Sequence, residues 1–192
     1  MCDQAAGTGW SEVLYQGRLL RLVLRSTARG MREIVEHPGA VAILITDEQG
    51  RVLLVRQYRE GAQAELWEIP AGTVEAGEKP YATAQRELRE ETNLDGKLRY
   101  LGVIHPTPGY STERIFLFQL EGLNGVPAAA HEIEAVQFFT AEGILGLARG
   151  GKGGGETPGG VGFLSRFRGG LVSFVHIMMW VCLFFVTQLR PV

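Results

Sequence analysis

The feature that most constrains this chain is a charged stretch at residues 72–94, which reads GTVEAGEKPYATAQRELREETNL. Pro80 suits the first turn of a helix, and good helix formers follow it. On such a helix Glu87 lies one turn from both Glu90 and Glu91, so the three carboxylates share one face. Like charges at this spacing repel each other, and the face therefore destabilises the helix unless cations bind to it.

The acidic face predicts a site for divalent cations, because hard cations such as Mg²⁺ take oxygen ligands of this kind. Arg86 lies one helical turn before Glu90 and can hold a carboxylate in place. Tyr81, Ala84 and Leu88 lie on another side of the helix and can pack inward. The alternative is a solvated, charge-rich helix without a metal, which is the usual outcome for glutamate-rich helices.

The stretch resembles the Nudix box, whose pattern is G-x5-E-x7-R-E-U-x-E-E-x-G-U, where U is an aliphatic residue. The positions that match are Gly72, Glu78, Arg86, Glu87, Leu88, Glu90, Glu91 and Leu94. The second glycine of the box is replaced by Asn93, and asparagine is the next most tolerant residue for the left-handed conformation that ends such a helix. We expect this replacement to cost a little stability and to leave the chemistry intact.

Segments outside the box resemble the branch of the family that hydrolyses ADP-ribose. They are VRQYR at 55–59, WEIPAG at 67–72 and HPTPGYSTER at 105–114. The resemblance extends from about residue 11 to residue 149 and implies metal-dependent hydrolysis of ADP-ribose to AMP and ribose 5-phosphate. Two alternatives stay open: hydrolysis of another nucleoside diphosphate sugar such as GDP-mannose, or a catalytically silent domain that binds nucleotides.

The resemblance also implies a metal site that holds Mg²⁺, with Mn²⁺ as an alternative. Its ligands would be the side chains of Glu87, Glu90 and Glu91 and the backbone carbonyl of Ala71. Glu90 would have a catalytic role beside its role as a ligand. Glu78 would orient the loop before the helix, or Arg86.

Substrate binding would depend on residues near the diphosphate. We expect Arg56 or Arg59 to clamp a phosphate, because a guanidinium donates two parallel hydrogen bonds to phosphate oxygens. The alternative for each arginine is a surface salt bridge. Pro108 lies where the branch carries a proline, and its loop would contact the substrate. We interpret Trp67 as core packing rather than as a stacking surface for adenine.

The general base is the least determined residue of the site. In this branch it is often a glutamate in the loop before the last strand, where the sequence reads AAAHEIEAV at 128–136. We expect Glu132 to be the base, with Glu134 in the same loop and Glu113 after the Pro-Gly loop as alternatives. His131 could itself accept a proton, because histidine titrates near neutral pH.

The rest of the chain predicts strands mixed with helices. Short apolar runs predict strands at 13–15, 19–24, 31–35, 40–46, 51–57, 97–104, 114–120 and 133–139, and a second helix at 141–149. A turn at 47–50 would join two of these strands into a central hairpin. This order indicates an α/β fold. The resemblance specifies a Nudix-type α/β/α sandwich around a mixed sheet at 39–149, preceded by a small N-terminal strand region at 1–38.

Composition and charge limit the partners and the compartment. The net charge is −2, and no basic run indicates nucleic acid as a partner, so a small nucleoside diphosphate sugar is the expected ligand. Cys2 and Cys182 lie at opposite ends and form no disulfide framework, and residues 1–10 lack the apolar core of a signal peptide. We therefore expect a cytoplasmic protein. The resemblance implies a homodimer in which the N-terminal strands reach the partner.

The C-terminal residues depart from the resemblance. Residues 150–170 form a Gly-rich linker that no packed helix tolerates. Residues 171–189 carry no charged side chain and are long enough to span a bilayer. Three interpretations stay open: a membrane tail anchor, an apolar helix packed on the domain or in a dimer interface, and a shifted reading frame that replaces the true C-terminal helix. In each case we expect this tail to carry no catalytic residue.

Overall fold

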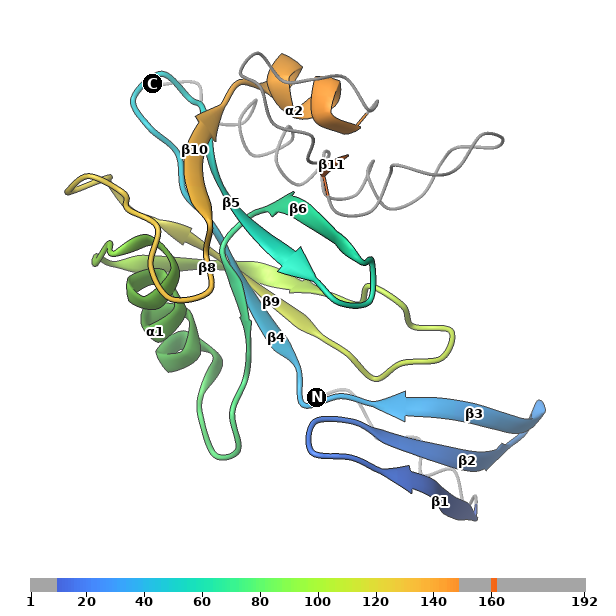
Figure 1. The fold of residues 1–192 in the computed structure, drawn as a ribbon. Helices are drawn as coiled ribbons and strands as arrows, with labels where there is room; N and C mark the ends of the chain where they lie inside the picture. The colour runs from blue at the N-terminus through green and yellow to red at the C-terminus, as the bar shows by residue number, and fades with distance from the viewer. Residues whose placement is uncertain (1–9, 149–159, 162–192) are drawn as a thin grey trace.

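The computed structural model of the protein describes residues 10–148 and 160–161 (Figure 1). The elements in chain order are β1 (Ser11–Gln16), β2 (Arg21–Thr27), β3 (Gly30–Glu36), β4 (Ala40–Leu44), β5 (Val52–Arg59), β6 (Ala64–Glu68), β7 (Ala71–Thr73), α1 (Pro80–Thr92), β8 (Leu98–Ile104), β9 (Ile115–Leu120), β10 (Ala135–Phe139), α2 (Ala141–Ala148) and β11 (Gly160–Val161). The predicted apolar segment at 171–189, and all of the linker at 150–170 except 160–161, lie outside this description. Within the described residues, no helix is long and apolar enough to cross a bilayer.

The described strands form three sheets. The sheet in the order β7-β4-β9-β8 is mixed, because β4 runs parallel to β9 and antiparallel to β7. The sheet in the order β10-β5-β6-β11 is antiparallel except at β11, which runs parallel to β6. Strands β1, β2 and β3 form a separate antiparallel sheet, which projects from the main body near the start of β4 in Figure 1. The predicted α/β fold with a mixed sheet and an N-terminal strand region is confirmed.

Strand β4 lies at the centre of the fold because both of its faces are apolar. On one side, a cluster of buried side chains joins this segment to α1: Val41, Ile43, Ile45, Ala84 and Leu88. On the other side, Leu44 belongs to a second cluster with Trp67 of β6 and Leu147 of α2. The two helices therefore cover opposite sides of the sheets, which explains why the sequence of this strand is a continuous apolar run. The burial of Trp67 agrees with its interpretation as core packing.

The prediction of a central hairpin is correct at the turn and wrong beyond it. Thr46 forms a bridge with Val52, and the side chain of Asp47 closes the turn by accepting backbone N–H groups. Further along, β4 pairs with β7 and β9, whereas β5 pairs with β10 and β6. Both strands are apolar on two faces, so each becomes an inner strand of its own sheet. Strands β6 and β7, which supply these pairings, are absent from the strands that the sequence predicted.

Helix α1 begins and ends where the sequence predicts. Pro80 is its first residue, and Lys79 before it is extended, with φ −92° and ψ 143°. Asn93 adopts the left-handed conformation, with φ 55° and ψ 23°, and its N–H donates to the carbonyl of Arg89 at 3.0 Å. Asparagine thus ends the helix in the conformation that the glycine of the box would adopt.

The loop at 105–114 is attached to the end of β3. The Val35 N–H donates to the Tyr110 carbonyl at 2.7 Å, and the Thr112 N–H donates back to the Val35 carbonyl at 2.9 Å. The His37 N–H donates to Oγ1 of Thr112 at 3.0 Å. The position of this loop therefore depends on where the N-terminal sheet ends.

Candidate active site

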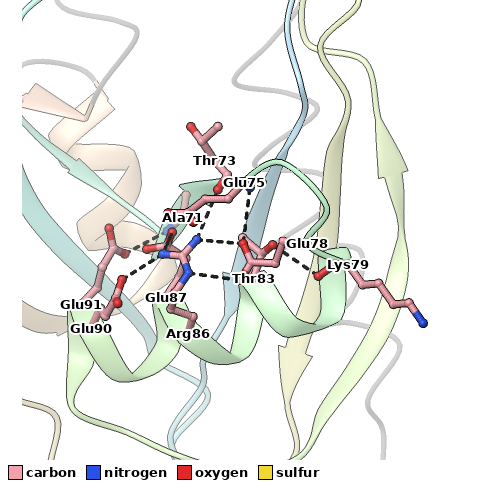
Figure 2. A network of polar contacts seen from close by, with 10 residues as sticks. All are labelled: Ala71, Thr73, Glu75, Glu78, Lys79, Thr83, Arg86, Glu87, Glu90 and Glu91. Carbon is pink, nitrogen blue, oxygen red and sulfur yellow. Dashed lines mark hydrogen bonds and ion pairs between the residues drawn. The ribbon is translucent and has the colours of Figure 1, made fainter. Parts of the chain in front are cut away.

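Arg86 forms hydrogen bonds with three glutamates of the candidate site (Figure 2). Its Nη1 donates to Glu87 Oε1 at 2.7 Å and to Glu90 Oε2 at 2.9 Å. Its Nε and Nη2 donate to the two oxygens of Glu78, both at 3.2 Å. A longer hydrogen bond of 3.4 Å, from Nη2 to the Thr73 carbonyl, ties the helix to β7. The hydrogen bonds with Arg86 lower the pKa of Glu78, and those with Glu78 raise the pKa of Arg86.

Glu91 lies outside this network and is buried. Its Oε2 accepts the backbone N–H of Ala71 at 2.9 Å, and the residue is only 8% exposed. Burial raises the pKa of Glu91 to about 8, although the hydrogen bond from Ala71 acts in the opposite direction. Burial also raises the pKa of Glu87. The charged forms of two neighbouring carboxylates are therefore both disfavoured by loss of water.

Gly72 leaves the space that the side chain of Glu87 occupies. A Cβ atom added to Gly72 would overlap with Cδ and Oε1 of Glu87. The glycine at the start of the box is thus required by a close approach of the glutamate side chain to the backbone of β7.

These residues fit a divalent cation by their donor chemistry. All the candidate donors are oxygens, and a cation would offset the burial of Glu87 and Glu91. In the part of the chain that the structure describes, no three acidic, histidine or cysteine side chains are gathered as a metal centre. Arg86 instead holds Glu87 and Glu90, whereas the Ala71 N–H holds Glu91. A role of the Ala71 carbonyl as a ligand stays a prediction.

The two candidate arginines of β5 lie on opposite faces of its sheet, because side chains alternate along a strand. Leu53, on the face of Arg59, packs in the cluster that contains α1. The guanidinium of Arg56 instead lies 5.7 Å from the ring of Trp67, in the cluster that contains α2. The charge of Arg59 also acts on the pKa of Glu91. The structure therefore brings Arg59 to the acidic face and places Arg56 on the other side.

Glu68 is a residue of this site that the sequence analysis missed. It lies at the end of β6 on the same face as Arg59, and its charge acts on Glu91. The signal that could have identified it is the alternation of the WEIPAG segment, which sends Trp67 and Glu68 to opposite faces.

The candidate bases before β10 differ in their surroundings. Glu132 is exposed and follows His131, whose backbone is left-handed with φ 53°. Glu134 reaches Arg56, with 3.5 Å between its Oε2 and the Nε of the arginine. These contacts lie on the α2 side of the sheet, and the role of Glu132 as the base stays a prediction.

The other predicted contacts lie in the loop at 105–114. Oε1 of Glu113 lies 3.9 Å from Nδ1 of His37. Pro108 is exposed in the same loop. The contact of Glu113 is thus with the N-terminal region, and the roles of Glu113 and Pro108 also stay predictions.

Comparisons with known proteins agree with this geometry. The family model described as the NUDIX domain matches residues 36–156. The ADP-ribose pyrophosphatase of Bacillus subtilis is 36% identical over 119 residues, which cover 59% of this chain and 64% of that protein. The ADP-ribose pyrophosphatase of Mycobacterium tuberculosis is 41% identical over 131 residues, which cover 64% of this chain and 63% of that protein. The methanol dehydrogenase activator of Bacillus methanolicus is 36% identical over 126 residues, which cover 62% of this chain and 68% of that protein.

The fold and the acidic helix define an α/β domain of the class that the family model describes. This chain belongs to the Nudix family, whose hydrolases generally need divalent metal ions. The match spans less than two thirds of the length of the two ADP-ribose pyrophosphatases, 64% and 63%.

The close approach at Gly72 leads to a first prediction. Gly72→Ala should displace the side chain of Glu87, lower the free energy of unfolding by about 1–3 kcal/mol as overpacking does, and weaken Mg²⁺ binding. Thermal melts and calorimetric titration with Mg²⁺ measure both effects. Gly61→Ala is the matched control, because a Cβ at Gly61 meets no atom within 4 Å. Equal melting and equal Mg²⁺ affinity in the two variants would contradict the prediction.

The burial of Glu91 leads to a prediction about pH. Its pKa is about 8 in the folded protein against an ordinary value of 4.5. The folded state therefore binds a proton more tightly than the unfolded state, and stability falls as the pH rises from below 4.5 through about 8. Glu91→Gln keeps an oxygen for the Ala71 N–H and removes this titration.

Melting curves in EDTA measure the effect. The melting temperature of Glu91→Gln should exceed that of the unchanged protein by on the order of 5 °C or more in alkaline buffer, and the two should nearly coincide only when the pH falls to 4.5 or below. A difference that does not vary with pH would show that Glu91 is not desolvated as described.

Proposed function

We propose that this protein hydrolyses ADP-ribose with one water molecule to AMP and ribose 5-phosphate, and that Mg²⁺ is the preferred cation, with Mn²⁺ as an alternative. The observation that carries the proposal is the acidic face of α1, on which two buried carboxylates and Glu90 lie beside Arg59. The name of the relatives from Bacillus subtilis and Mycobacterium tuberculosis supports ADP-ribose as the substrate. We also propose a cytoplasmic setting, because the two cysteines lie far apart in the sequence.

The cation site would consist of Glu87, Glu90 and Glu91 with the carbonyl of Ala71. A divalent cation bound there supplies positive charge to the diphosphate and lowers the pKa of a water molecule. Glu91 is held in place by the Ala71 N–H, and Glu87 by Arg86 above Gly72. These contacts orient the carboxylates before any ligand binds, so little reorganisation is needed when one does.

Arg59 would bind a phosphate oxygen of the substrate on the same face. A base would take a proton from the attacking water. The first candidate is Glu132, in the loop before β10, and the second is Glu113, in the loop at 105–114. Pro108 would shape the wall of the substrate site. The bond between one phosphorus and the bridging oxygen breaks, and the water oxygen ends on one of the two phosphate products.

A panel of nucleoside diphosphate sugars tests the proposed reaction. With Mg²⁺, ADP-ribose should turn over at least about tenfold more efficiently than GDP-mannose, and AMP should appear with ribose 5-phosphate in equal amounts. Glu91→Gln should lower kcat by about a hundredfold or more while the far-ultraviolet spectrum stays unchanged. Much faster turnover of GDP-mannose would refute the substrate, and unchanged turnover by Glu91→Gln would refute the site. Glu132→Gln and Glu113→Gln in the same assay decide between the two bases.

We also propose that the protein is a homodimer that uses the sheet of β1, β2 and β3. This sheet and the turn between β1 and β2 expose several large apolar side chains, and an exposed apolar patch often marks an interface. They are Val13, Leu14, Tyr15, Leu19, Leu20 and Met31, each at least 38% exposed. A second copy of the chain, bringing the same sheet, would cover apolar surface of both copies at once.

Sedimentation velocity tests the dimer. Tyr15 is 63% exposed, so Tyr15→Glu should fold and should shift the protein towards the monomer. Val103→Glu is the control, because Val103 is also exposed, at 42%, and lies on β8 outside the N-terminal sheet. A monomeric unchanged protein would rule out the proposal, and so would a Tyr15→Glu variant that remains fully dimeric.

A further inference from the structure

Glu68 is hydrogen-bonded in an unusual way, because one of its oxygens serves several donors. Its Oε2 accepts Nε of Arg59 at 2.8 Å and Nη2 of the same arginine at 2.6 Å. The same oxygen accepts Nε2 of Gln57 at 3.4 Å, and Gln57 is buried with 6% exposure. The carboxylate is thus fixed by a buried amide on one side and fixes the arginine on the other.

The pairing of β5 and β6 shows how far the arginine side chain reaches. In the register of the two strands, Glu68 lies opposite Val55 and Arg59 lies opposite Ala64. The guanidinium must therefore extend back along the ribbon to meet Glu68. Ala71, whose N–H holds Glu91, follows Glu68 closely in the chain. The hydrogen bonds with Glu68 thus draw Arg59 towards the acidic face of α1.

The guanidinium keeps donors for a ligand in this position. Arginine has five N–H groups in a planar fork, and the hydrogen bonds that the described residues form with Arg59 use Nε and Nη2. The side chain of Arg59 is 42% exposed. A guanidinium that is already oriented loses less conformational freedom when it binds a phosphate, and binding is therefore tighter.

We infer that Glu68 is a positioning residue that holds the guanidinium of Arg59 where it can bind the diphosphate of the substrate beside the acidic face of α1. The inference deepens the proposed function and rests on it.

The same two strands contain a matched control on their other face. Glu65 of β6 approaches Arg56 of β5, with 3.4 Å between Oε2 and Nε. Arg56 packs over Trp67 in the cluster that contains α2. Glu65→Gln therefore removes a glutamate charge next to a β5 arginine, as Glu68→Gln does, but on the face away from α1.

Steady-state kinetics with ADP-ribose and saturating Mg²⁺ test the inference. Glu68→Gln should raise KM about tenfold and change kcat by less than about threefold, because it removes binding rather than a chemical step. Glu65→Gln should leave both constants unchanged. In the background of Arg59→Ala, the substitution Glu68→Gln should have no further effect, because Glu68 acts through the arginine. Glu68→Asp keeps the charge but shortens the side chain, and should raise KM to a smaller extent.

An unchanged KM in both Glu68 variants would overturn the inference, as would effects of Glu68→Gln and Arg59→Ala that simply add. If Glu68→Gln does not fold, Glu68→Asp decides by the same criterion.

If the unchanged protein does not hydrolyse ADP-ribose, the proposed function fails, and calorimetric binding of ADP decides the inference. Weaker ADP binding by Glu68→Gln than by Glu65→Gln would support it, whereas equal binding, or no ADP binding by the unchanged protein, would overturn it.

Discussion

The structure depends on one constraint, which is that helix α1 carries several negative charges while one of its sides is buried. Leu88 and Ala84 pack against β4, and the carboxylates one turn away cannot all remain in water. Arg86 offsets this cost by binding Glu78, Glu87 and Glu90 at once. Among the described residues, Glu91 is hydrogen-bonded only by a backbone N–H, and burial raises its pKa to about 8. The helix is thus stable enough to fold, and its carboxylates are still not fully neutralised. A bound cation would stabilise their charged forms, which is the property that a cation site needs.

The position of that helix follows from β4. Because β4 is apolar on both faces, α1 packs on one side of it while Trp67 of β6 and α2 pack on the other. The short strand β7 pairs with β4 and so lies directly beneath α1. This places the N–H of Ala71 under Glu91 and the bare backbone of Gly72 under Glu87. The hydrophobic core therefore fixes the backbone groups that orient the acidic side chains.

The parts of this arrangement that could be predicted from the sequence are the local ones. The acidic face depends on spacing within a single helix, and Pro80 and Asn93 determine where that helix begins and ends. Strand pairing is not local. The turn at Asp47 was recognisable, but nothing in the neighbouring residues shows that β4 and β5 separate into two sheets. The candidate bases could not be placed either, because Glu113 and Glu132 lie in loops whose positions depend on partners far away in the chain.

Because side chains alternate along β5, the two arginines of VRQYR have different surroundings. Their positions differ by three, an odd number, so a strand places them on opposite faces. The face of Arg56 meets Trp67 and α2, where the guanidinium is largely buried and its Nε has no hydrogen-bond partner among the described residues. The face of Arg59 meets α1, where its charge acts on Glu91. Similar residues in one strand therefore pack over an aromatic ring on one side and lie near the acidic face of α1 on the other. The alternation along the strand already predicts that the two arginines diverge, and the packing of α1 on the odd-numbered face determines which of them lies near the acidic side chains.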